Sequence, residues 1–182
     1  MNNLPIFIEP NKLRIIDFTE KHITQTYIGW LNDKEIVKYS ELRHSTHTYE
    51  SCYQYWKSFY GTAHLFCAIE VFQEGAWMHV GNINSYINEK NKIADIGIII
   101  GEKSVWGKGY GLIVWKAVCN YLFIERKMRK VTGGALSTNK AMLKIMQRVG
   151  MIEDGTRVRH YICEGQTVDV CHYALFSDAS NV

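Results

Sequence analysis

A glycine-rich loop stands between an apolar strand and a helix in the middle of the chain, and it constrains the fold more than any other segment. Residues 105–111 read Val-Trp-Gly-Lys-Gly-Tyr-Gly. Residues 93–100 before them are rich in isoleucine, and residues 112–125 after them have helical periodicity. Glycines remove the Cβ atoms that block close approach, and the first N–H groups of a helix point at an anion. The segment therefore predicts a phosphate-bearing cofactor, and with it an enzyme.

The loop differs from the two best-known phosphate motifs. A dinucleotide fingerprint needs G-x-G-x-x-G and a P-loop needs G-x-x-x-x-G-K-[ST], whereas this loop reads G-x-G-x-G. Taken alone, it also fits a tight strand-to-helix turn that binds nothing. The interpretation therefore depends on a second segment.

That second segment is residues 131–151. It reads as a strand, then Asn139, which can cap a helix or bond a ligand, then a short amphipathic helix closed by Gly150. Together the two segments resemble the GNAT superfamily of acyl-CoA-dependent N-acetyltransferases, whose patterns are Q/R-x-x-G-x-G/A and N-x-x-S/A-x-x-x-Y-x-K-x-G-F. The sequence of the glycine loop is most similar to that of the RimJ/RimL-like branch.

The resemblance implies an α/β (α+β) GNAT fold, with a mixed, mostly antiparallel central sheet of six to seven strands flanked by helices. We expect residues 1–182 to form one domain. The patterns predict strands at 13–18, 63–71, 77–86, 93–100, 130–136, 153–162 and 167–176, and helices at 22–31, 33–37, 49–60, 112–125 and 140–149. The apolar run 93–100 predicts burial on both faces. Gly97 is expected to mark a bulge that opens this strand away from 131–136.

Composition narrows the class of protein. With 47% hydrophobic and 21% charged residues and a net charge of +3, the chain has an ordinary globular balance, and it lacks a basic stripe with aromatics for nucleic acid. No apolar run approaches the ~20 residues of a membrane span, and no secretory signal is evident. Five cysteines without C-x-x-C spacing predict neither a zinc site nor a disulfide framework. We expect a cytoplasmic monomer or homodimer with a small-molecule amine as its partner.

Acetyl-CoA is the co-substrate that the resemblance implies, with no metal. The glycine loop would hold its phosphates, and the strand before the loop would flank its thioester arm and offer backbone N–H groups to the oxyanion. The isoleucines of that strand can equally be ordinary core residues. The implied cofactor-binding set is Ile98, Ile99, Ile100, Val105, Trp106, Gly107, Lys108, Gly109, Tyr110, Gly111 and Asn139.

Acetyl transfer to an amine needs a base, and Asp95 is the candidate, because family members with a carboxylate base often carry Glu at the matching position. The shorter Asp would act through a water; it can also be a structural carboxylate on a strand. Asn139 is the second catalytic candidate, as a hydrogen-bond partner of the CoA arm or of a water. The family's Tyr and Ser are Met146 and Met142 here, so the proton source for the thiolate stays open; Tyr161 and Tyr173 are conceivable.

For the acceptor, Trp30, Arg43 and His44 are the proposed contacts, with Arg and His meeting an anionic group such as a nucleotide phosphate. A polar surface loop is the alternative. His44 and His47 without a carboxylate partner argue against a metal site. The expected function is transfer of an acetyl group from acetyl-CoA to a primary amine by direct attack in a ternary complex, an amino sugar nucleotide being favoured. A protein or peptide N-terminus, or a non-catalytic acyl-CoA-binding module, remains open.

Overall fold

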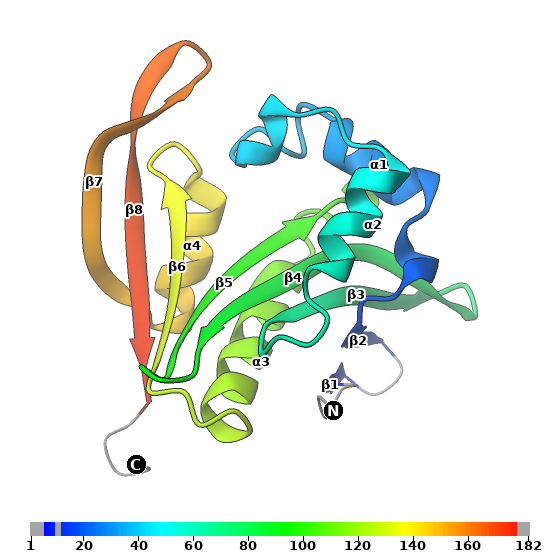
Figure 1. Ribbon diagram of the computed structural model, residues 1–182, viewed down its shortest axis with the longest axis horizontal. Helices are drawn as coiled ribbons and strands as arrows, with labels where there is room; N and C mark the ends of the chain where they lie inside the picture. The colour runs from blue at the N-terminus through cyan, green and yellow to red at the C-terminus, as the bar shows by residue number, and fades with distance from the viewer. Residues whose placement is uncertain (1–5, 10–11, 178–182) are drawn as a thin grey trace.

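A computed structural model describes residues 6–9 and 12–177. Within these residues, eight strands form one sheet in the order β1-β2-β3-β4-β5-β6-β8-β7 (Figure 1). The strands are β1 (Ile6–Glu9), β2 (Leu13–Asp17), β3 (Leu65–Gln73), β4 (Ala76–Asn88), β5 (Ile93–Ile100), β6 (Lys130–Leu136), β7 (Ile152–Cys163) and β8 (Gln166–Phe176). The β5–β6 pair is parallel and its neighbours are antiparallel. The mixed, mostly antiparallel sheet is confirmed, and the short edge strand β1 brings it to one strand more than expected.

Helices cover both faces of the sheet. They are α1 (Gln25–Asn32), α2 (Tyr49–Lys57), α3 (Tyr110–Ile124) and α4 (Lys140–Val149), with short 3-10 helices η1 (Glu20–His22), η2 (Glu41–His44) and η3 (Lys103–Val105). α3 and α4 pack on one face, and α1 and α2 on the other (Figure 1). No helix in the described part of the chain is both long and apolar enough to cross a membrane.

The helix expected at 33–37 is wrong, because a side chain takes over the local backbone bonds. The Asp33 carboxylate accepts from the N–H groups of Glu35 (2.8 Å) and Ile36 (3.4 Å), which holds a turn rather than a helix. Asp and Asn commonly compete with helices in this way. In contrast, Thr48 caps α2, and its side chain accepts from the Ser51 N–H.

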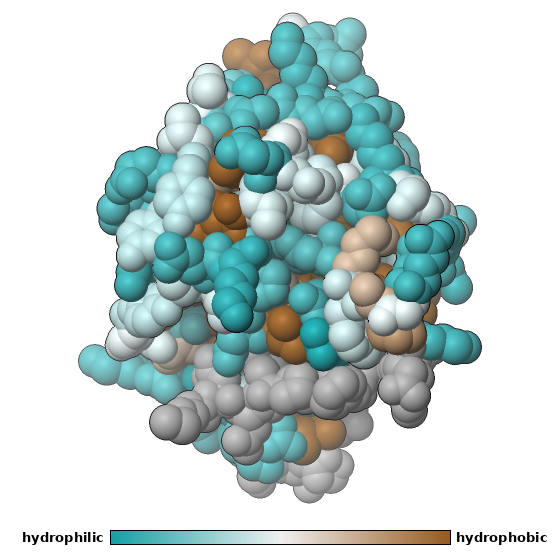
Figure 2. Space-filling view, turned by 90° about the vertical axis from the view of Figure 1, so that its right-hand side faces the viewer, coloured by the Kyte–Doolittle hydropathy of each residue, from teal (hydrophilic) through white to brown (hydrophobic). Residues whose placement is uncertain are grey.

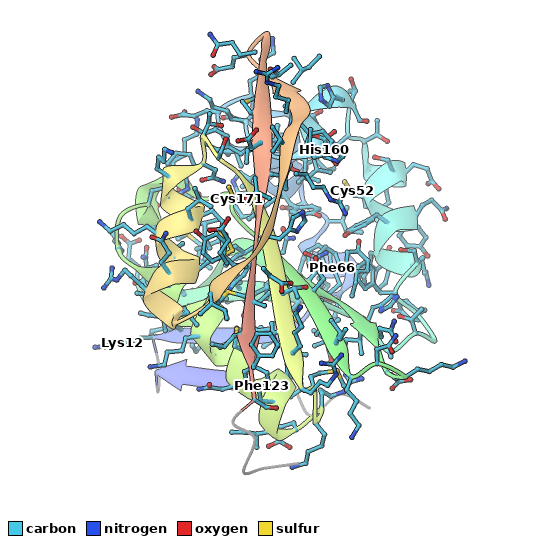
Figure 3. The ribbon with its side chains drawn as sticks, turned by 90° about the vertical axis from the view of Figure 1, so that its left-hand side faces the viewer. Lys12, Cys52, Phe66, Phe123, His160 and Cys171 are labelled. Carbon is cyan, nitrogen blue, oxygen red and sulfur yellow. The ribbon has the colours of Figure 1, made fainter. Side chains whose placement is uncertain are left out.

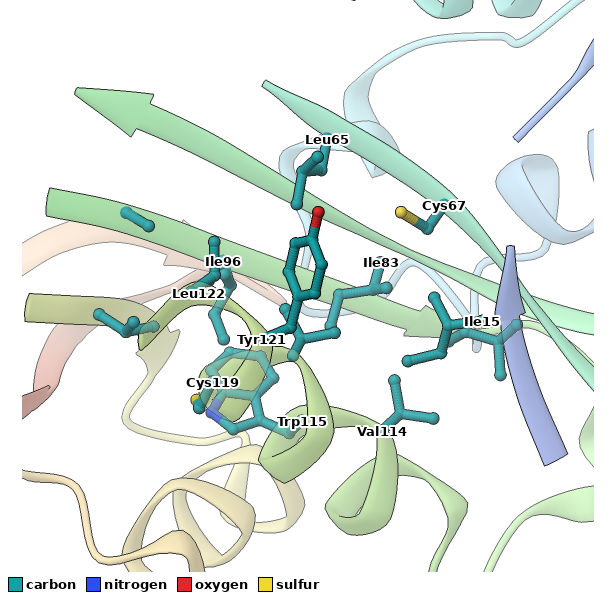
Figure 4. Close-up of a cluster of buried hydrophobic side chains, with 14 of the residues drawn as sticks. Ile15, Leu65, Cys67, Ile83, Ile96, Val114, Trp115, Cys119, Tyr121 and Leu122 are labelled. Carbon is teal, nitrogen blue, oxygen red and sulfur yellow. The ribbon is translucent and has the colours of Figure 1, made fainter. Parts of the chain in front are cut away.

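The larger core lies between the sheet and α3. Trp115 and Leu122 of α3 are fully buried against the sheet residues Ile83 and Ile96 (Figure 4). Gly133 in β6 makes room for the indole, since a Cβ there would lie 2.7 Å from a Trp115 ring carbon. α3 therefore packs directly beneath the strand that follows it.

A second, aromatic core lies on the α1/α2 face. Cys52 of α2 and Phe66 of β3 belong to it and lie on this side of the sheet (Figure 3). The Trp56 indole donates to the Phe18 carbonyl at 2.9 Å, which ties α2 to the end of β2. The face turned to the viewer in Figure 2 is mainly hydrophilic, with apolar residues in small separate patches.

Candidate active site

Strands β5 and β6 separate part-way along their length. Their pairing ends at Asp95 and Thr132, although β5 stays paired with β4 as far as Ile100 (Figure 1). The far half of β5 thus has a strand neighbour on one side only, and its backbone groups on the β6 side are open to a ligand. The expected bulge at Gly97 is wrong, because Gly97 pairs in register with Asn84. A Cβ atom added at Gly97 would lie only 2.8 Å from the amide oxygen of Asn84, so the glycine makes room for the Asn84 side chain.

A cavity of about 940 Å³ lies at this separation, within the ~300–1,000 Å³ typical of ligand sites. It reaches from α1, α2 and the segment 36–47 across β4 and β5 to β6 and the start of α4. Ile98, Ile99 and Ile100 line it and are only half-buried, so the expected burial of β5 on both faces is wrong at this end. The three side chains also pack against the cores, Ile98 and Ile100 against the larger one and Ile99 against the aromatic one.

The glycine loop has the geometry of an anion cradle. Gly107 and Gly109 have φ angles of +75° and +83°, and a Cβ at either position would meet no atom within 4 Å. Among the described residues, no backbone carbonyl accepts from the N–H groups of Gly107, Gly109, Tyr110 or Gly111. Open space and unused donors at the start of a fifteen-residue helix fit a phosphate-bearing cofactor.

The rest of the loop is held by the protein. The Trp106 indole donates to the Ile100 carbonyl at 2.8 Å and so fixes the loop to the end of the cavity strand. Val105 is buried in the core, whereas Lys108 is exposed and Tyr110 is half-buried. The cavity lining itself excludes residues 105–111. The loop therefore lies beyond the end of the β5 wall rather than inside the cavity.

Asn139 lines the cavity and also caps α4, because its Oδ1 accepts from the Met142 N–H at 3.1 Å. Met142 lines the cavity as well, but Met146 is fully buried in the core. Tyr173 accepts a hydrogen bond from Gln147 at 3.2 Å, and Tyr161 packs in a separate small cluster. Neither tyrosine lines the cavity.

Asp95 lies where β5 and β6 part, on the sheet face that carries Gly97 and Ile99. Thr132 donates a hydrogen bond of 2.6 Å to its Oδ2. Although the residue is exposed, desolvation by the surrounding protein raises the pKa of its carboxyl, while the Thr132 hydrogen bond and the nearby His172 lower it. A carboxylate with a raised pKa beside a cavity suits proton transfer. Asp95 itself lies outside the cavity lining.

The three residues expected to contact the acceptor lie outside the cavity lining. Trp30 is 7% exposed in the aromatic core and packs against Gly101. The Arg43 guanidinium donates to the carbonyls of Ser40 (2.7 Å) and Ile162 (3.1 Å) and pairs with Glu41 (2.8 Å). His44 is exposed beside Glu41. Arg43 thus anchors the tip of the β7–β8 hairpin to the segment that walls the cavity.

A polar stripe on β4 was missed at the sequence level. Asn82, Asn84 and Tyr86 alternate along the strand, all face the cavity, and all line it. The Tyr86 hydroxyl lies 3.0 Å from that of Tyr55, on α2. Polar side chains at every second position from 82 to 86 were the available signal.

Metal binding has no support among the side chains that the structure describes, which are those of residues 12–177. No three His, Cys, Asp or Glu side chains among them are grouped closely enough to hold an ion. His47 lines the cavity, but its Nε2 lies 3.0 Å from the Leu42 carbonyl.

The fold thus places a glycine loop at a helix start next to a parallel pair of strands that separate around a cavity. The family model described as "Acetyltransferase (GNAT) domain" matches residues 12–152, and the chain belongs to this family. No curated protein sequence matches the chain.

Solved structures share the fold at low sequence identity. A spermidine N-acetyltransferase from Vibrio cholerae, in complex with CoA and spermine, has a TM-score of 0.80 at 17% identity, covering 91% of this chain and 95% of that one. RimL, the ribosomal L7/L12 alpha-N-protein acetyltransferase, in complex with CoA, has 0.82 at 16%, covering 97% and 99%. A microcin C7 self-immunity acetyltransferase, in complex with acetyl-CoA and AMP, has 0.78 at 15%, covering 93% and 94%.

Proposed function

We propose that the protein transfers an acetyl group from acetyl-CoA to the primary amine of a small molecule, by direct attack within a ternary complex. One observation carries this proposal. The cavity joins the open side of β5 to a wall made by α1, α2 and β4. A donor lying along β5 and an acceptor lying against that wall would meet inside one cavity.

Acetyl-CoA supplies an activated thioester, and the chain's residues do the rest. Gly107, Gly109 and the first N–H groups of α3 would bind its phosphates. Backbone N–H groups at Ile98–Ile100 would stabilise the oxyanion. Asp95 would take the proton of the attacking amine through a water, because it stands outside the cavity lining. Asn139 would position the CoA arm or a water with the amide Nδ2 that its capping bond leaves available.

An amino sugar nucleotide is the acceptor we favour. The cavity is large, and its lining combines apolar residues with neutral hydroxyl and amide groups while being nearly uncharged, which suits a hydroxyl-rich molecule. The nucleotide part has weaker support, because Arg43 is already paired and His44 lies outside the lining. A peptide N-terminus is the second candidate, since RimL shares the fold.

The test is calorimetric titration with acetyl-CoA, followed by a thiol-release assay on UDP-glucosamine, TDP-4-amino-4,6-dideoxyglucose, spermidine and a peptide with a free N-terminal serine. Binding with thiol release on an amino sugar nucleotide is the expected result. Release on the peptide alone would move the function to the second candidate. Binding without release on any amine would identify an acyl-CoA-binding module instead, and no binding would overturn the assignment of the loop.

A further inference from the structure

Asn82 is a buried amide whose hydrogen bonds are incomplete. The residue is 8% exposed, and its side-chain Oδ1 is inaccessible and accepts no hydrogen bond from any described residue. A buried acceptor left unpaired costs stability comparable to a lost hydrogen bond. Such a group in a native protein calls for an explanation.

The position of Asn82 supplies one. It lines the cavity and is paired with Ile99, the middle of the three isoleucines on the open strand. Adjacent strands lie about 5 Å apart, so Asn82 is one strand away from the proposed site of acyl transfer. Asn84 and Tyr86 continue the stripe outward and grow progressively more exposed. Asn82 is thus the innermost polar group on this wall.

The charges around the cavity restrict what can enter. Glu41 is the one lining residue with a carboxylate, and it is already paired with Arg43 at 2.8 Å. A polyamine carries several positive charges, and burying them without carboxylate partners is costly. Neutral amides and hydroxyls, in contrast, match a ligand that has hydroxyl or amide N–H donors.

We infer that Asn82 is a specificity-determining residue that accepts a hydrogen bond from the acceptor, and that it selects a hydroxyl-bearing amine over a polyamine. This inference rests on the proposed function for the identity of the cavity as the acceptor site. To that function it adds the residue that discriminates between acceptors. It also adds the feature that this residue recognises, which is a hydrogen-bond donor on the acceptor close to the reacting amine.

The same strand offers a matched control. Ser85 is 1% exposed and its Oγ is also buried without a partner in the described residues, but it faces α3 among Leu65, Val118 and Tyr121. Asn82→Leu and Ser85→Ala each remove one unpaired buried polar group from β4, and only the first lies on the acceptor wall. If Asn82 serves a ligand rather than the fold, neither change should lower the Tm.

The experiment measures acceptor binding by calorimetry to CoA-saturated protein, so that it does not depend on turnover. The probes are UDP-glucosamine, TDP-4-amino-4,6-dideoxyglucose, spermidine and the serine peptide. We expect an amino sugar nucleotide to bind the wild type and Ser85→Ala equally and Asn82→Leu at least about tenfold more weakly, because a missing hydrogen bond to a buried group costs about that much or more. CoA affinity should be equal in all three proteins.

Three results would overturn the inference. They are equal acceptor affinity in Asn82→Leu, a wild type that binds only spermidine or none of the probes, and an Asn82→Leu protein that melts well below Ser85→Ala. Acceptor binding that Asn82→Leu weakens, without thiol release from acetyl-CoA, would support the inference while refuting the proposed function. The two failures are therefore distinguishable.

Discussion

The Thr132 hydroxyl donates a 2.6 Å hydrogen bond to the carboxylate of Asp95, and these two residues form the last paired position of β5 and β6 before the strands separate. The candidate base is thus fixed to the edge of the opening by its neighbour on the parallel strand. This arrangement makes its protonation and its position experimentally separable.

Replacing Asp95 by Asn should lower kcat by about 100-fold or more, the usual contribution of a general base. The Kd for acetyl-CoA should stay close to that of the wild type, because Asp95 lies outside the proposed cofactor contacts. Steady-state kinetics and calorimetry measure the two quantities. Unchanged kcat across the pH range would remove Asp95 as the base.

Replacing Thr132 by Val should move the acidic limb of kcat/KM to higher pH. The base is active when ionised, so activity is present above its pKa and is lost as the pH falls through it. Desolvation already raises the pKa of Asp95, and the Thr132 hydrogen bond lowers it by stabilising the carboxylate. Without that bond the pKa should rise further. Thr132→Ser keeps the hydroxyl and should keep the wild-type profile; a limb that stays in place in Thr132→Val contradicts the mechanism.

Replacing Gly109 by Val should abolish CoA binding while the protein remains folded. The side chain would occupy the space that is open at this position, and the positive φ would cost about 1–3 kcal/mol of stability. Gly75→Val is the matched control, since Gly75 has a φ of +82°, equally open surroundings, and a place in the turn between β3 and β4. Similar losses of stability with CoA binding lost only in Gly109→Val are expected. Normal CoA affinity in Gly109→Val would refute the proposal that the glycine loop binds the CoA phosphates.

Replacing Gly101 by Ala should destabilise the protein by about 1–3 kcal/mol, because the added methyl group would overlap the Trp30 ring. Adding Trp30→Phe should restore part of the loss, so that the double variant is more stable than the sum of the single changes predicts. Urea unfolding measures this coupling. Additive losses would mean that Trp30 and Gly101 do not pack against each other.

The elements around the glycine loop could be predicted because their signals are local. The bounds expected for β5, β6 and α4 agree with the structure. Alternating glycines, an Asn at a helix start and a Gly at its end each act within a few residues. Asp33 shows where local pattern fails, since one carboxylate redirects two backbone N–H groups and replaces a helix with a turn.

The acceptor side could not be predicted in the same way. Arg43 looks like an anion-binding residue in the sequence, but its partner at Ile162 is 119 residues away and belongs to a hairpin tip. Trp30 looks like an aromatic residue of a pocket, but it is buried in the core, where its ring occupies the space that a side chain at Gly101 would fill. Both outcomes depend on contacts between distant segments, which periodicity does not reveal.

The anchor between the hairpin and the cavity wall has a consequence for how this enzyme can change. The Arg43 guanidinium donates to the backbone carbonyls of Ser40 and Ile162, and the Cys163 thiol donates to the backbone carbonyl of Lys38. Every residue type has a backbone carbonyl, so these three bonds do not depend on which side chains stand at positions 38, 40 and 162. The frame of the cavity can thus persist while the side chains that line it change.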